Sequence, residues 1–141
     1  MGRGENAFDI YRRTCPVYQE EHSDIRRVEP YVYAQTVAAR ASYDEGAARN
    51  SWLTGTAAWT FVNISQYILG VKPTPAGLRI DPCLPGALEE YSVRRRYRGA
   101  AYHIHVVQTG TYSLRVDGEN VAGNLIPMKD GKKKYHVEVT V

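Results

Sequence analysis

The sequence predicts an α+β protein with helices in residues 1–70 and an antiparallel, jelly-roll-like β domain in residues 71–141. Two observations predict this class. Apolar residues recur at helical spacing before Gly70, and they alternate with polar residues after it. A Pro- and Gly-rich stretch, residues 71–77, reads as a connector between the two patterns. We therefore expect two structurally different parts in one chain.

The first part is predicted to contain helices separated by loops. Residues 5–13 have helical apolar spacing, and Pro16 ends that segment. The charged stretch 19–29 is predicted to be a loop. Pro30 is expected to open a second helix through Ala38, because proline is tolerated in a first helical turn.

After a predicted loop at residues 41–50, a third helix is expected over residues 57–69, and Gly70 supplies its stop signal. This helix is apolar nearly all round, so it requires neighbours on several sides. Three helices are too few to pack against one another and also to cover one face of a sheet. We therefore expect the helical part to be the end of something larger, or to assemble with other chains.

The second part shows the alternation typical of strands with one buried face. Apolar and polar residues alternate over residues 102–106, 112–116 and 135–141. Asp-Gly pairs at 117–118 and 130–131 supply turn chemistry between them. The alternation predicts antiparallel strands rather than the continuously apolar strands of a parallel sheet.

The composition of the 141-residue sequence predicts a soluble, cytoplasmic protein. No apolar run reaches the roughly 18–20 residues that a membrane-spanning helix needs, and the first residues lack a secretory apolar core. Cys15 and Cys83 match no zinc or redox spacing, which favours two reduced thiols. Because no apolar run is long enough to span a membrane, no membrane partner is expected.

Two charged or metal-ligating patterns are better explained as solvated strand faces. The basic run 94–98 divides between the two faces of a strand, and the net charge is only +3, so no nucleic-acid partner is expected. His103 and His105 share one face, but the sequence offers no third ligand nearby, so no metal is expected.

A Thr-Gly-Thr step, residues 54–56, precedes the third helix and lies between the two tryptophans of the chain. Backbone N–H groups at a helix start lack intrahelical partners, and the helix dipole favours negative charge there. A hydroxyl beside glycine at this position can hold an anion. The alternative is a threonine cap on an ordinary core helix.

Several blocks, in order and almost from end to end, resemble the C-terminal region of glycoside hydrolase family 94, the cellobiose and chitobiose phosphorylases. The blocks are SDIR (23–26), EPYVYAQ (29–35), NSWLTGTAA (50–58), QYILGV (66–71), GLRIDPCLP (77–85) and RGAAY (98–102). The resemblance implies the last helices of an (α/α)6 barrel in residues 1–70, followed by a C-terminal β domain in residues 71–141.

The resemblance also implies inverting phosphorolysis, in which phosphate cleaves a β-linked disaccharide to an α-sugar 1-phosphate and a free sugar. Inorganic phosphate is then a co-substrate and no cofactor is needed. The catalytic Asp of the family lies upstream of the segment that this chain matches. We therefore expect a fragment that is inactive alone, within a complete enzyme that forms a homodimer.

The same resemblance assigns residues to the phosphate subsite. Thr54 and Gly55 would hold the anion with a hydroxyl and a backbone N–H, and Gln35 would add an uncharged amide donor. Glu29 and Trp52 are weaker candidates for substrate binding. For Glu29 the alternative is a role in the loop before Pro30, and for Trp52 a place in the wall of the core.

A second function, from a different class, remains open at this stage. The chain would then be a non-catalytic carbohydrate-binding or structural β domain with a helical tail. An upstream reading frame that codes for the other barrel helices, with an acidic residue in the helix expected to contain the catalytic acid, would favour the enzyme. An unrelated upstream gene would favour the binding module.

Overall fold

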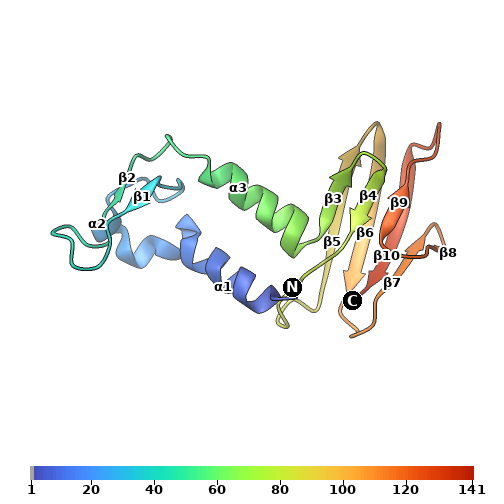
Figure 1. Ribbon diagram of the computed structural model, residues 1–141, viewed down its shortest axis with the longest axis horizontal. Helices are drawn as coiled ribbons and strands as arrows, with labels where there is room; N and C mark the ends of the chain where they lie inside the picture. The colour runs from blue at the N-terminus through green and yellow to red at the C-terminus, as the bar shows by residue number, and fades with distance from the viewer. Residues whose placement is uncertain (1) are drawn as a thin grey trace. The chain divides into compact units, whose positions relative to one another are not determined.

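The computed structural model describes residues 2–141 and divides into two compact units (Figure 1). One unit is Glu5–Asn63, and the other is Ile64–Val141 with the residues up to Gly4. Helices dominate the first unit and strands the second, so the predicted α+β class is confirmed. No helix among the described residues is long and apolar enough to cross a membrane.

The N-terminal unit begins with a helix that matches its prediction. Helix α1, Gly4–Thr14, has Glu5 in its first turn and arginines in its last turn, both favourable toward the helix dipole. It ends before Pro16, as expected. The further elements of this unit are the 3-10 helix η1 (Pro16–His22), α2 (Ser23–Arg26), β1 (Thr36–Val37), β2 (Ala48–Arg49) and α3 (Thr56–Val62).

The predicted loop at residues 19–29 is wrong for most of its length. The proline that stops α1 also opens η1, because its fixed φ suits a first helical position. Helix α2 follows directly and ends where Arg27 takes the left-handed conformation, with φ 56°. The charged side chains from Glu20 to Arg26 therefore lie on short helices.

The predicted second helix, from Pro30 to Ala38, is also wrong. Strand β1 pairs antiparallel with β2, and Val37 lies opposite Ala48. The Ala38 N–H donates to the Ala47 carbonyl at 2.9 Å, which extends the pairing. The segment is rich in β-branched and aromatic residues, which favour extended backbone when a partner strand is present. The predicted loop at 41–50 holds except for β2.

The third predicted helix is confirmed as a continuous helical segment. Helix α3 passes into the π-helical turns of η2, Asn63–Ile68, and Gly70 follows with φ 67°. The structure buries no side chain of α3. Trp59 and Phe61 are 75% and 61% exposed. The need for further neighbours, expected from its apolar composition, is therefore unmet among the residues described.

The C-terminal unit contains two sheets (Figure 1). The five-stranded sheet has the order β5-β6-β10-β7-β8, and the three-stranded sheet has the order β3-β4-β9. Their bounds are β3 (Val71–Thr74), β4 (Gly77–Ile80), β5 (Glu90–Tyr97), β6 (Ala100–Val107), β7 (Ser113–Val116), β8 (Glu119–Asn120), β9 (Leu125–Pro127) and β10 (Lys134–Thr140).

Two details of this unit correct the prediction. The expected connector at 71–77 contains β3, which tolerates Pro73 because it is the edge strand of its sheet. The central pair β6 and β10 is parallel, whereas the other strand pairs described in this unit are antiparallel. Alternation along each strand reports the buried face, and it does not fix the direction of the neighbouring strand.

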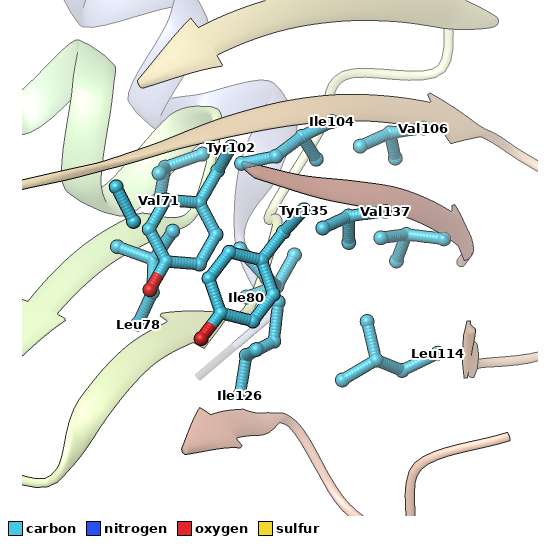
Figure 2. Close-up of a cluster of buried hydrophobic side chains, with 12 residues drawn as sticks. Val71, Leu78, Ile80, Tyr102, Ile104, Val106, Leu114, Ile126, Tyr135 and Val137 are labelled. Carbon is cyan, nitrogen blue, oxygen red and sulfur yellow. The ribbon is translucent and has the colours of Figure 1, made fainter. Parts of the chain in front are cut away.

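The core lies between the two sheets. Alternate residues of β6 and β10 face inward, as predicted, and meet apolar side chains of β3, β4 and β9. Figure 2 shows Tyr102 and Tyr135 side by side, with ring centroids 4.5 Å apart and planes only 4° from parallel. The Tyr135 hydroxyl accepts a hydrogen bond from the Lys129 N–H at 3.0 Å. Buried tyrosine thus keeps a polar partner.

The predicted Asp-Gly turn between β7 and β8 is confirmed, and its aspartate also binds a neighbouring strand. Asp117 and Gly118 both have positive φ, 52° and 88°. The Asp117 carboxylate accepts from the Lys132 ammonium at 2.5 Å and from the His136 N–H at 2.9 Å. These bonds, the lysine bond first, hold the pKa of Asp117 below its ordinary value of 3.8.

Replacing Asp117 with asparagine is expected to lower the free energy of unfolding by about 1 kcal/mol near neutral pH, since the carboxylate is partly exposed. Asparagine tolerates the same φ, so the change isolates the charge. Because the folded pKa is depressed, this stabilisation is present above 3.8 and is lost as the pH falls through the lower folded value. Urea unfolding of both proteins across this pH range measures it; a difference that persists in acid contradicts it.

Candidate functional site

The Thr-Gly-Thr step lies at the start of α3, as predicted. Gly55 is the N-cap residue, with φ −78° and ψ 0°. The Thr54 hydroxyl accepts from the Thr56 N–H at 3.1 Å and lies 2.6 Å from the Thr56 hydroxyl. Thr54 thus satisfies one of the free donors at this helix start. The alternative to anion binding, a threonine cap on a core helix, is found only in part, because the N-cap residue is Gly55 without a side-chain bond and α3 has no buried residue.

Gln35 lies beside Asn50, fifteen residues further along the chain. The Asn50 side-chain amide donates to Gln35 Oε1 at 2.9 Å, and the Gln35 N–H donates to the Arg49 carbonyl at 3.1 Å. The β1–β2 pairing brings the two segments together. Because the carbonyl oxygen of the Gln35 side chain is engaged, its amide nitrogen is the end that is oriented to donate to a ligand.

Glu29 and Trp52 form a second pair between the same two segments. The Trp52 indole N–H donates to Glu29 Oε1 at 2.9 Å. This bond is the main reason why the pKa of Glu29 lies below its ordinary value. A backbone hydrogen bond and a hydrogen bond from the Ser51 side chain lower it further. Tyr31 meets Trp52 edge to face, with ring centroids 6.2 Å apart. Tyr31 and Trp52 remain 72% and 67% exposed.

The backbone of the motif is held in an unusual conformation. Asn50 and Trp52 both have positive φ, 56° and 71°. Asparagine tolerates this region, but for a bulky residue it costs about 1–2 kcal/mol. The indole bond to Glu29 helps to hold Trp52 in place. Strain of this kind concentrates at ligand-binding segments, which favours a functional role for residues 50–52.

Three of the predicted site residues, Gln35, Glu29 and Trp52, therefore take part in two hydrogen-bonded pairs. Gln35 meets Asn50, and Glu29 meets Trp52, whereas the hydrogen bonds described for the Thr54 hydroxyl are with Thr56. Sequence reasoning missed Asn50 and Tyr31 as partners. Both lie inside blocks already singled out, EPYVYAQ and NSWLTGTAA, so their positions were the available signal.

No cluster of three or more potential metal ligands occurs within residues 2–141. The face that His103 and His105 share, as predicted, also contains His136 from β10, whose ring is 5.6 Å from that of His103. Cys15 and Cys83 are free thiols. The chemistry of the motif segments is thus hydrogen bonding through hydroxyl, amide, carboxylate and indole groups.

The sequence matches two known family profiles. Residues 1–70 match the profile described as "Glycosyl hydrolase 94 superfamily, catalytic domain". The chain belongs to this superfamily. Residues 72–122 match the profile described as "Glycosyl hydrolase family 65, C-terminal domain". The two matches adjoin at the point where helical segments give way to strands.

Curated relatives extend the similarity over nearly the whole chain. N,N'-diacetylchitobiose phosphorylase of Vibrio proteolyticus is 36% identical over 99% of this chain, which is 18% of that protein. The enzyme of the same name from Vibrio furnissii is 39% identical over 86% of this chain and 16% of its own length. Solabiose phosphorylase of Paenibacillus borealis is 36% identical over 98% of this chain and 19% of its own length. The chain spans about a fifth of these relatives.

Proposed function

We propose that this segment works within an inverting disaccharide phosphorylase. Residues 1–70 would supply the last helices of an (α/α)6 barrel, and residues 71–141 the jelly-roll-like β domain that follows. The observation that carries the proposal is the similarity to phosphorylases along 99% of the chain, with 18% of the relative covered. The complete protein is proposed to be a cytoplasmic homodimer that uses inorganic phosphate and no cofactor.

In the proposed reaction, a phosphate oxygen attacks the anomeric carbon of a β-linked disaccharide. The bond from that carbon to the glycosidic oxygen breaks, and an aspartic acid outside this chain gives the leaving oxygen its proton. Inverting glycosidases use a second carboxylate to activate water. Phosphate is already an anionic nucleophile, so the corresponding task is to hold the anion in line for attack.

Thr54, Gly55 and Gln35 are proposed to perform that task. The Thr54 hydroxyl can rotate from Thr56 toward an anion, the Gly55 N–H lies at the helix start, and the Gln35 amide nitrogen is oriented by Asn50. All three are donors without charge. Donors fixed before the reaction stabilise the developing charge without reorganising.

Glu29, Trp52 and Tyr31 are proposed to contact sugar. The Glu29 carboxylate stays ionised at neutral pH, because hydrogen bonds lower its pKa, and it can accept from a sugar hydroxyl. The exposed faces of Trp52 and Tyr31 offer apolar surface for a pyranose ring. Aromatic rings with a neighbouring polar group fit the mixed surface of a sugar.

A longer protein that contains this segment tests the proposal directly. It is incubated with cellobiose, N,N'-diacetylchitobiose or solabiose, with and without inorganic phosphate, and sugar 1-phosphate is quantified. We expect an α-sugar 1-phosphate from at least one disaccharide, and only when phosphate is present. Equal release of free sugars with and without phosphate would indicate hydrolysis, and no turnover of any β-linked disaccharide would favour a binding module.

A further inference from the structure

A row of three hydrogen-bond donors crosses the polar face of the five-stranded sheet. The register places Arg94 of β5 opposite His103 of β6, and His103 opposite His136 of β10. The two imidazoles are stacked, with ring centroids 5.6 Å apart and planes 25° from parallel. Lys134, two residues before His136, lies on the same face of its strand.

A second row lies next to the first and neutralises its own charges. The Ser92 hydroxyl lies 3.0 Å from Nδ1 of His105, whose Nε2 lies 3.9 Å from Glu90. Arg115 pairs with Glu138 at 3.1 Å. In the part of the chain that the structure describes, the ion pairs on this face belong to the second row. The cationic first row is not part of these ion pairs, and the carboxylate that adjoins it, Asp117, which accepts from the His136 N–H, is itself paired with Lys132.

We propose that Arg94, His103 and His136 form a binding site for a compact dianion of the phosphate class, free or carried by a sugar. A trough of about 490 Å³ lies over these side chains and is lined also by Ser92, His105 and Glu138. A guanidinium presents paired donors that match phosphate geometry, and each imidazole adds an N–H. The hydroxyl and carboxylate of the second row suit the hydroxyls of an attached sugar.

The charges around the histidines favour an anion over a metal ion. Partial desolvation, followed by the charges of Lys134, Arg94 and His136, lowers the pKa of His103. The same cations would repel a divalent metal. The environment disfavours protonated His103, and a bound dianion removes this disadvantage, because it attracts protonated His103 and the cations around it.

Binding and protonation on this face are therefore linked. An anion that prefers protonated His103 must raise the pKa of His103 by the reciprocal effect. The charges that act on His103 are those of Arg94 of β5 and of Lys134 and His136 of β10. His105 and Glu138 line the same trough, and the Asp117 carboxylate accepts from the His136 N–H. All but the two carboxylates are cations or become cationic in acid, so anion binding is expected to tighten as the pH falls from neutral into the range in which histidine is protonated.

Sulfate is the probe for the first experiment, because it remains a dianion from about pH 8 to pH 5, across the titration of histidine. Imidazole resonances of the full chain are followed by NMR at constant ionic strength, with sodium sulfate or sodium chloride. We expect sulfate to raise the pKa of His103 by about 0.5 and to shift the imidazole resonances of His136. His22, in the Glu5–Asn63 unit, is an internal control and should not respond.

Variants separate a specific site from a general ionic effect. Arg94→Gln is expected to weaken sulfate binding about fivefold, whereas Arg79→Gln on the exposed face of β4 leaves it unchanged. Repeating the titration with inorganic phosphate, glucose 1-phosphate and glucose distinguishes a free from a sugar-borne anion; a response to glucose alone overturns the proposal. Equal shifts of all four histidines, or binding of Ni²⁺ to His103 and His136 without any sulfate effect, also overturns it.

This inference does not depend on the proposed phosphorylase function. Its residues lie in the β unit, and its readout is the titration of named histidines rather than turnover. The sulfate experiment can therefore fail while phosphorolysis is found, and phosphorolysis can be absent while the sulfate response is found.

Discussion

Replacing Gly70 with alanine is expected to lower the free energy of unfolding of the β unit by about 2–5 kcal/mol. Gly70 has φ 67°, a conformation that costs a residue with a Cβ atom about 1–2 kcal/mol. A Cβ atom there would also lie 2.2 Å from the carbonyl carbon of Asp81 and from the nitrogen of Pro82. Backbone atoms cannot rotate away, so the chain must shift, and such overpacking costs a further 1–3 kcal/mol or so.

Gly99 provides the matched control for this substitution. Its φ is 78°, close to that of Gly70, but nothing lies within 4 Å of a Cβ atom built there. Gly99→Ala is therefore expected to cost only the conformational term, about 1–2 kcal/mol. Denaturant unfolding of the two variants and the unchanged chain gives both values. Equal losses would show that steric contact with Asp81 and Pro82 does not matter.

The parts of the fold that the sequence predicts correctly are those fixed by burial of one face. Tyr102, Ile104 and Val106 alternate with histidines because β6 has one side in the core and one in solvent. The alternation of apolar and polar residues along the strand follows from that environment and can be read from the segment itself. The signal of Gly70 is equally local, since a helix stop that needs positive φ favours glycine.

Two of the errors arise where distant segments decide the structure. Residues 30–38 have an acceptable helix start, but their backbone groups pair with residues 47–49 instead. The direction of β10 beside β6 depends on chain connections rather than on side-chain alternation. The β-branched and aromatic residues of 30–38 favour extended backbone, but neither segment carries a signal for the strand that it pairs with, so periodicity and capping signals could not supply it.

The residues of the candidate site also differ in whether a local sequence signal predicts them. Thr54 and Gly55 are recognisable from local features, because a hydroxyl and a glycine stand at a helix start. Gln35 and Glu29 have no such local signal, and only the resemblance to a family suggested them. Their partners, Asn50 and Trp52, are known from the fold, which joins segments about twenty residues apart.

Replacing Thr54 with alanine, in a longer protein that contains this segment, is expected to lower kcat/KM for phosphate by about 10²–10³-fold. This is the range for losing one donor that is positioned toward developing charge. The change also removes the acceptor of the Thr56 N–H, and losing a cap of this kind costs about 1 kcal/mol of stability. Initial rates at varied phosphate, together with thermal unfolding, measure the two effects separately.

Two variants distinguish phosphate binding from capping. Thr54→Ser keeps the hydroxyl and is expected to retain kcat/KM for phosphate within about threefold, because both hydrogen-bonding roles survive. Thr56→Ala removes the neighbouring hydroxyl, 2.6 Å away, and leaves that of Thr54 in place. If Thr56→Ala and Thr54→Ala depress phosphate kinetics equally, then Thr54 only shapes the start of α3. A loss confined to Thr54→Ala, together with a loss of stability of only about 1 kcal/mol, assigns the Thr54 hydroxyl to the anion.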